Sequence, residues 1–84
     1  MAVSVILYSK PDCHLCEDAK EKLARLSARG YQLNVREQDI TADPELFQRF
    51  RYVIPVVEVQ GQTLQAPISE YKLERLISNV AASA

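Results

Sequence analysis

The stretch VSVILYSKPDCHLC, residues 3–16, combines an apolar run, a turn and the only two cysteines of the chain. Residues 3–8 are almost continuously apolar and rich in β-branched side chains, which predicts a strand covered on both faces near the middle of a sheet. Cys13 and Cys16 follow three residues apart, near enough to close a disulfide within one helical turn. Such a pair can cycle electrons, bind a metal or staple a loop, and the rest of the sequence decides between these roles.

The length and composition predict one small domain, residues 1–84. A hydrophobic fraction of 48% supports a single core, and 84 residues are too few for two domains. Ten basic and eleven acidic residues give a formal net charge of -1, which offers no electrostatic case for binding nucleic acid or an anionic membrane. We also expect a monomer.

The amino terminus predicts the compartment. It has neither the charged opening nor the cleavage site of a signal peptide, and its apolar run is far shorter than the roughly 20 residues of a membrane span. We therefore expect a cytoplasmic protein. Structural disulfides are uncommon in that reducing compartment, so the location favours catalysis or metal binding over stapling.

Hydrophobic periodicity predicts the next elements. A helix over residues 13–28, ended by Gly30, is indicated by apolar side chains at helical spacing: Cys16, Ala19, Leu23 and Leu26. Residues 31–36 alternate between apolar and polar side chains, which predicts an edge strand with one wet face. Asp43, as a helix cap before Pro44, predicts a second helix of about two turns whose apolar face is Leu46, Phe47 and Phe50.

The second half of the chain predicts a hairpin and a last helix. Residues 56–59 and 63–65 read as short antiparallel strands joined by a turn at Gln60 and Gly61. After Ser69, a candidate helix cap, one helical stripe holds Leu73, Leu76, Ile77 and Val80. The order β-α-β-α-β-β-α predicts an α/β fold, a four-stranded mixed sheet flanked by helices, which is the thioredoxin-like architecture.

Three motifs resemble those of glutaredoxins over nearly the whole chain. They are Tyr8-Ser9-Lys10 leading to Cys13-x-x-Cys16, Asp43-Pro44-Glu45-Leu46 at the second helix, and Ile54-Pro55-Val56 before the third strand. The Cys-His-Leu-Cys pattern is more similar to the short glutaredoxin-like proteins of bacteria than to the Cys-Pro-Tyr-Cys of the main glutaredoxins. The resemblance implies a thiol–disulfide oxidoreductase that contributes to cell redox homeostasis and electron transport.

The chemistry of the pair also follows from its place at a helix start. Unpaired backbone amides and the positive end of the helix dipole favour a thiolate at Cys13, and such sites lower a cysteine pKa to roughly 3.5–7.5. Cys13 would attack a substrate disulfide, and the more buried Cys16 would resolve the mixed disulfide. Lys10 and His14 are candidate substrate-binding residues. Lys10 would add positive potential, and His14 would do so as a cation, with an ordinary exposed residue of the first turn as the alternative; Asp12, Glu17 and Asp18 oppose the thiolate.

Pro55 is the second informative position. By base rate, a proline that opens a strand follows an ordinary trans bond. The glutaredoxin resemblance instead implies a cis bond, with Pro55 against the two cysteines and the backbone of the preceding residue free to pair with an extended substrate. Val53 and Ile54 are therefore candidates for a short substrate-binding edge.

Other roles for the cysteines stay open. A closed zinc site needs about four ligands, and the chain offers only the pair and His14 between them, so we expect no metal site within the chain. A metal or iron–sulfur cluster shared with outside thiols remains an alternative, as do a binding module without enzymatic activity and an inactive family member.

The sequence departs from glutaredoxins where glutathione would bind. Glutaredoxins that use glutathione usually carry a Gly-Gly pair after the hairpin, and here the run is Gln65-Ala66-Pro67-Ile68-Ser69-Glu70. Pro67 lacks an amide that could bind an anion, and Val53 replaces the usual Thr. We expect no tightly bound cofactor. The predicted partners are proteins that contain disulfides or small thiols, with glutathione in doubt as the reductant and thioredoxin reductase as an alternative.

Overall fold

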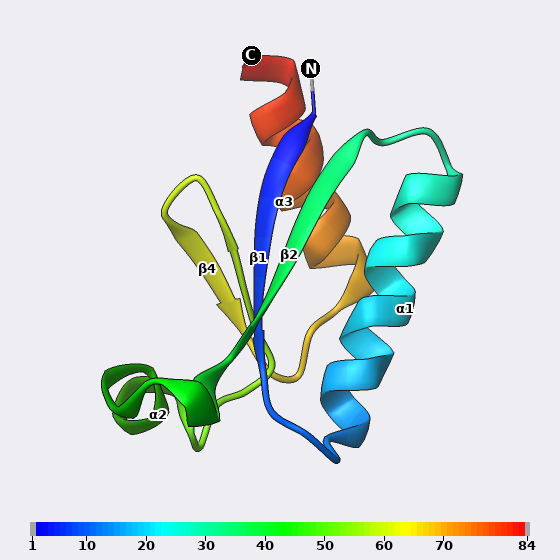
Figure 1. The fold of residues 1–84 in the computed structure, drawn as a ribbon. Coiled ribbons are helices and arrows are strands. Elements are labelled where there is room, and N and C mark those ends of the chain that lie inside the picture. The colour runs from blue at the N-terminus through cyan, green and yellow to red at the C-terminus, as the bar shows by residue number, and fades with distance from the viewer. Residues whose placement is uncertain (1, 84) are drawn as a thin grey trace.

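The structure, a computed structural model, describes residues 2–83. Its elements follow the predicted order, with one added 3₁₀ helix (Figure 1): β1 (Val3–Ser9), α1 (His14–Ala28), β2 (Leu33–Asp39), η1 (Ile40–Ala42), α2 (Pro44–Phe50), β3 (Val56–Val59), β4 (Gln62–Gln65) and α3 (Glu70–Ser83). None of the helices in residues 2–83 has the length and apolar character that crossing a membrane requires.

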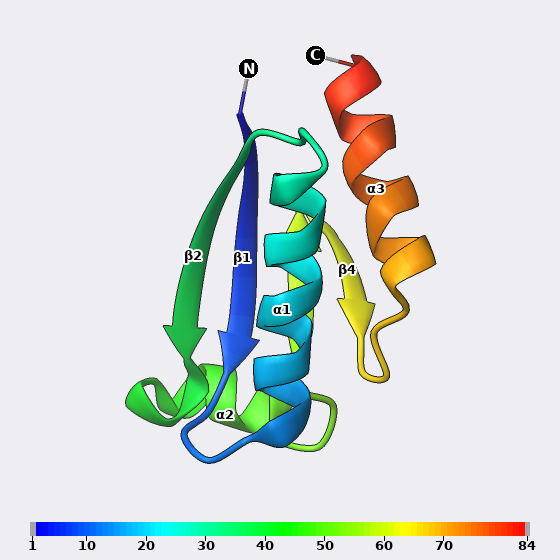
Figure 2. The same cartoon turned by 90° about the vertical axis from the view of Figure 1, so that its right-hand side faces the viewer.

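The sheet has the strand order β2-β1-β3-β4, which places β1 inside the sheet and β2 at its edge, as predicted. β1 runs parallel to β2 and antiparallel to β3, and β3 and β4 form the predicted hairpin. Helices α1 and α3 pack on one face of the sheet, while α2 lies at the end where β1 and β2 finish (Figure 2). The mixed four-stranded sheet confirms the predicted fold class.

The main core lies between the sheet and the two long helices. Alternate residues of β1 and β3 point toward α1 and α3, because side chains of a strand alternate between its faces. The core contains Val3, Val5, Leu7, Val57 and Val59 from the sheet, Ala19, Leu23 and Leu26 from α1, and Ile68, Leu73, Ile77 and Val80 from the last helix and the loop before it. Burying each large aliphatic side chain contributes about 1.5–3 kcal/mol.

A smaller core lies on the opposite face, beneath α2. Ile40, Phe50 and Val56 are its buried residues, and the ring of Tyr8 packs against Phe50 with 4.7 Å between the ring centroids. The half-buried side chains of Val53 and Ile54 belong to the same cluster. This cluster ties the segment before Pro55 to the end of β1, directly before the cysteine loop.

The prediction that β1 is covered on both faces was wrong. The residues that face α1 and α3 are buried, but Ser4 on the other face is exposed and Ile6 is only half-buried. Helix α2 has seven residues and covers only the Tyr8 end of that face. An apolar run does not reveal how long the covering helix will be.

The second strand is also displaced from its predicted bounds, 31–36. Tyr31 precedes β2 and its hydroxyl donates to Glu74 at 3.0 Å, whereas the strand continues beyond the alternating pattern until Asp39 pairs with Ser9. Val35 is 44% exposed despite its apolar side chain. Backbone pairing with β1 sets the length of β2, and side-chain alternation does not report it.

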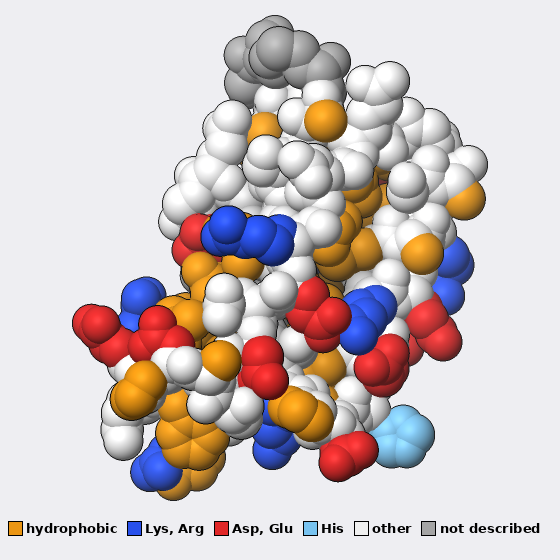
Figure 3. All heavy atoms as spheres, in the orientation of Figure 1, with side chains coloured by type: hydrophobic (Ala, Val, Ile, Leu, Met, Phe, Trp, Pro, Cys, Tyr) orange, Lys and Arg blue, Asp and Glu red, His pale blue; other side chains and the backbone are white. Residues whose placement is uncertain are grey.

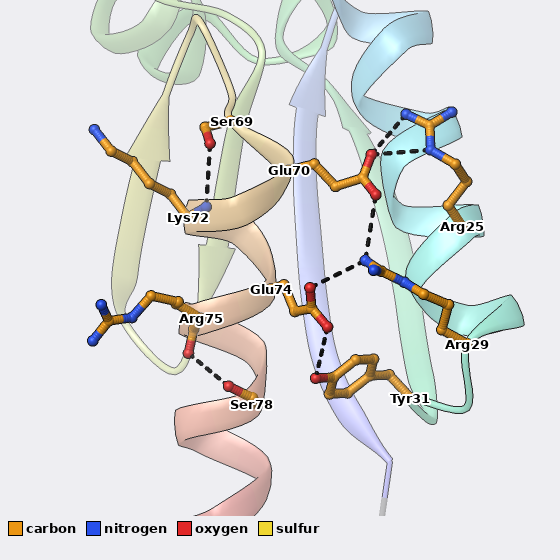
Figure 4. A network of polar contacts seen from close by, with 9 residues as sticks. All are labelled: Arg25, Arg29, Tyr31, Ser69, Glu70, Lys72, Glu74, Arg75 and Ser78. Atoms are coloured by element: carbon orange, nitrogen blue, oxygen red, sulfur yellow. Dashed lines mark hydrogen bonds and ion pairs between the residues drawn. The ribbon is translucent and has the colours of Figure 1, made fainter.

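A polar network fastens α1 to α3 at the surface (Figure 4). Glu70 accepts from Arg25 at 2.8 Å and from Arg29 at 3.3 Å, and Glu74 pairs with Arg29 at 3.2 Å. The Arg25 hydrogen bond, followed by the charges of both arginines, lowers the pKa of Glu70 below its ordinary value. The two helices therefore meet through matched charges outside the core that they share.

Candidate active site

Cys13 and Cys16 form a disulfide at the start of α1. Their Cα atoms lie 5.2 Å apart, and Cys13 is the residue that caps the helix. Its Sγ accepts a hydrogen bond from the Cys16 amide at 3.1 Å. Cys13 is half-buried, whereas Cys16 is 1% exposed, so solvent and a substrate reach the first sulfur more easily than the second.

The local sequence explains why Cys13 takes the capping position. Asp12 has a φ of 58°, a left-handed conformation that Asp tolerates better than most residues, and it turns the chain sharply into the helix. Cys13 is then extended, with φ -114° and ψ 107°, and the helix begins at His14. A sulfur at this position faces the free amides and positive dipole of a 15-residue helix, an environment that favours thiolate over thiol once the disulfide is reduced.

Two depressions lie at this end of the molecule, and Cys13 lines one of them. One is lined by Asp12, Cys13, His14 and Glu17. The other, on the side of β2, is lined by Ser9, Lys10, Pro11, Glu17, Lys20, Glu37 and Asp39. Figure 3 shows that most charged side chains on that face of the molecule gather over its lower part, with acidic and basic groups intermixed.

A buried hydroxyl and an ion pair organise the second depression. The Ser9 hydroxyl, 2% exposed as a residue, donates to Glu37 at 2.6 Å, and Lys20 bridges Glu37 at 3.1 Å and Glu17 at 3.2 Å. The hydrogen bond from Ser9, and then that from Lys20, lowers the pKa of Glu37, while both carboxylates raise the pKa of Lys20. Sequence reasoning missed this cluster because the pairing of Ser9 with Glu37 depends on the register of β1 and β2.

The Ile54–Pro55 peptide bond is cis in the structure, and so is the Ala66–Pro67 bond, for which no cis conformation was predicted. The proposed substrate-binding edge beside Pro55 is mostly occupied. The amides of Val53 and Ile54 both donate to the Phe50 carbonyl, at 2.9 and 3.1 Å, and the Val53 carbonyl accepts from Ala66 at 3.2 Å. Within residues 2–83 the Ile54 carbonyl keeps no such partner, so the expected edge is reduced to this one acceptor.

The segment before α3 is held from two sides. The Lys22 ammonium donates to the Ile68 carbonyl at 2.6 Å while it pairs with Asp18 at 2.8 Å. The Ser69 hydroxyl accepts from the Lys72 amide at 3.3 Å, which makes Ser69 the helix cap that the sequence predicts. The main-chain groups of this loop are thus partly engaged within the protein.

The structure gathers the sequence-derived candidates at one end of the molecule without joining them all. Asp12, Cys13 and His14 share a depression and Lys10 lines its neighbour, while residues 53–55 follow α2 at the same end (Figures 1 and 2). Among residues 2–83, no group of three or more His, Cys, Asp or Glu side chains is arranged to hold a metal ion.

The chain is similar to proteins of known fold. Residues 4–80 match the sequence profile of the glutaredoxin-like domain (DUF836). A structural genomics target protein from X. campestris superposes with a TM-score of 0.76 and 29% identity, over 89% of this chain and 96% of that one. No curated protein is significantly similar.

Two thioredoxins show the same fold at lower identity. Desulfothioredoxin from Desulfovibrio vulgaris Hildenborough, solved in its reduced form, has a TM-score of 0.67 and 21% identity over 94% of this chain and 82% of its own. Mitochondrial thioredoxin 3 from Saccharomyces cerevisiae, in its oxidized form, has a TM-score of 0.66 and 18% identity over 92% and 77%.

Proposed function

Since the chain belongs to the glutaredoxin-like domain family, we propose that it is a dithiol–disulfide oxidoreductase in which Cys13 is the nucleophile and Cys16 the resolving thiol. The observation that carries this proposal is the cysteine pair itself. One sulfur caps α1 and is accessible, and the other is buried one turn further on, at disulfide distance.

The reaction comprises two exchanges. The Cys13 thiolate attacks one sulfur of a substrate disulfide, a new S–S bond forms as the substrate bond breaks, and the first substrate thiolate leaves with a proton from solvent. The Cys16 thiolate then attacks the Cys13 sulfur and releases the second substrate thiolate. The substrate gains two electrons and the protein ends as the Cys13–Cys16 disulfide, which an external dithiol must reduce.

We propose that this reductant is not glutathione. Pro67 has no amide, the Ala66 amide is already bonded to Val53, and the usual Gly-Gly pair is missing. These features remove main-chain donors that would hold the γ-glutamyl end of the tripeptide. A thioredoxin reductase or another dithiol donor in the cytoplasm, acting on protein disulfides as the final substrates, fits the site better.

The test uses two single variants and insulin as the disulfide substrate. Cys13→Ser should abolish reduction, whereas Cys16→Ser should accumulate a mixed disulfide on Cys13, because only the resolving step is lost. Intact-mass measurement after acid quenching detects the adduct. If wild-type protein reduces no insulin with dithiothreitol above the rate of the Cys13→Ser variant, and Cys16→Ser traps nothing, the proposal is wrong.

A further inference from the structure

Asp12 is a charged side chain beside the nucleophile that the proposed reaction does not use. It is exposed, and its carboxylate has no hydrogen-bond or ion-pair partner within residues 2–83. It lines the same depression as Cys13. An unpaired carboxylate opposes ionisation of a neighbouring thiol, so it brings no advantage to the intrinsic reactivity of Cys13.

The charges around the two depressions are unequal. Their walls contain two ammonium groups, Lys10 and Lys20, and four carboxylates, Asp12, Glu17, Glu37 and Asp39. His14 is the remaining titratable side chain in the walls beside the cysteine. The excess of two negative charges exceeds the formal net charge of -1 of the whole chain, so negative charge is concentrated around the two depressions, one of which Cys13 lines.

The pairing pattern does not cancel this excess. The one positive charge of Lys20 is divided between Glu17 and Glu37. The arginines of the neighbouring helix end lie over aromatic rings: Arg49 is 4.8 Å from the centroid of Phe50, and Arg51 is 4.5 Å from that of Tyr52. Neither arginine lines the depressions.

We propose that this site selects cationic disulfides, such as cysteines flanked by Lys or Arg in a protein substrate, and that Asp12 is a specificity-determining residue. The inference rests on the proposed function and concerns its substrate class. A unit charge in solvent some 7 Å from a substrate charge changes binding by about threefold, and salt reduces this effect. Anionic disulfides, glutathione disulfide among them, are then disfavoured by charge.

The experiment compares three small disulfides of similar length. Cystamine carries two ammonium groups, hydroxyethyl disulfide is neutral, and dithiodipropionate carries two carboxylates. Single-turnover oxidation of reduced protein is followed by acid quenching and mass spectrometry. Each rate is divided by that of dithiothreitol with the same disulfide, which corrects for the different leaving thiols. We expect the normalised rate to be about tenfold higher for cystamine than for dithiodipropionate at low salt. The ratio of the two rates should fall toward one in 1 M salt.

Two variants assign the preference to its source. Asp12→Asn keeps the side-chain shape and suits the left-handed backbone. It removes a threefold attraction for the cation and a threefold repulsion of the anion, so it should lower the ratio of cystamine to dithiodipropionate by up to about ninefold. Glu58→Gln is the matched control, because Glu58 lines a separate depression with Ala2, Gly61 and Val80 and loses the same charge. It should leave the ratio unchanged. The rate with hydroxyethyl disulfide reports general changes in reactivity.

The outcomes separate the two proposals. Equal normalised rates for the three disulfides, a preference for dithiodipropionate, or equal effects of Asp12→Asn and Glu58→Gln would overturn the charge selectivity. If none of the disulfides oxidises wild-type protein faster than the Cys13→Ser variant, the oxidoreductase proposal itself fails.

Discussion

The α1–α3 interface and the cysteine end of the molecule differ in how completely their charges are paired. At the interface, Glu70 and Glu74 are matched by Arg25, Arg29 and the hydroxyl of Tyr31 (Figure 4). At the cysteine end, within residues 2–83, Lys10, Asp12 and His14 have no such partners. The paired charges join two helices of the scaffold, whereas the charges without partners lie beside an accessible sulfur, where the proposed function would bring them next to a substrate.

The largest expected effect separates the two regions within one helix. Leu26 is fully buried and Leu15, between the cysteines, is 56% exposed. Leu26→Ala should lower the free energy of unfolding by about 2–5 kcal/mol because it leaves a cavity. Leu15→Ala, the same change on the surface, should cost less than about 0.5 kcal/mol. Urea unfolding of both variants in the reduced state measures the two free energies of unfolding. Comparable decreases for the two variants would contradict the distinction between a buried and an exposed leucine of α1.

The next largest effect is expected when the polar network between α1 and α3 is broken. Glu70→Gln removes the partner of Arg25 and Arg29, so it should lower the midpoint of urea unfolding at neutral pH, by less than Leu26→Ala does. Since Arg25 lowers the pKa of Glu70, the loss should be present above pH 4.5 and should diminish in high salt. A midpoint equal to that of wild type at low salt would show that the network does not stabilise the fold.

A smaller effect concerns acid stability at the cysteine end. Ser9 and Lys20 lower the pKa of Glu37 below its ordinary 4.5 in the folded protein. Its stabilising contribution is therefore complete above the unfolded-state pKa and is lost as the pH falls through the folded-state pKa. Glu37→Gln should flatten the decline of the unfolding midpoint below pH 4.5. If the unfolding midpoints of variant and wild type fall in parallel as the pH is lowered, ionised Glu37 does not stabilise the fold.

The smallest effect is expected for Asp12→Asn. Because the Asp12 carboxylate has no partner within residues 2–83, the variant should unfold at the same urea concentration as wild type, while its preference among charged disulfides changes. A clear loss of stability would mean that Asp12 belongs to the scaffold. The pair Glu70→Gln and Asp12→Asn thus compares a matched with an unmatched carboxylate.

The order of helices and strands could be predicted because each segment has its own hydrophobic periodicity and its own capping or turn residues. Asp43 and Ser69 do cap their helices, and Gly61 has the positive φ that a hairpin turn requires. The family resemblance, carried by motifs spread over the chain, was confirmed by the profile match over residues 4–80.

What could not be predicted depends on contacts between distant segments. The length of β2 follows from its pairing with β1, and the exposed half of β1 follows from the shortness of α2. The hydrogen bond from the Ala66 amide to the Val53 carbonyl likewise joins distant segments. The turn in which the Phe50 carbonyl accepts from Val53 and Ile54 is local, and the sequence pattern did not identify it. The substrate-binding roles of Lys10, His14, Val53, Ile54 and Pro55 stay predictions.

The relative reactivity of the two thiols tests the central claim most directly. Reduced protein is alkylated with limiting iodoacetamide across a pH series, and the labelled cysteine is identified by peptide mass spectrometry. The capping position and exposure of Cys13 predict labelling at least about tenfold faster at Cys13 than at Cys16, persisting at pH values where an ordinary thiol, with a pKa of about 8.5, is protonated. Equal labelling, or faster labelling of Cys16, would contradict the assignment of nucleophile and resolving thiol.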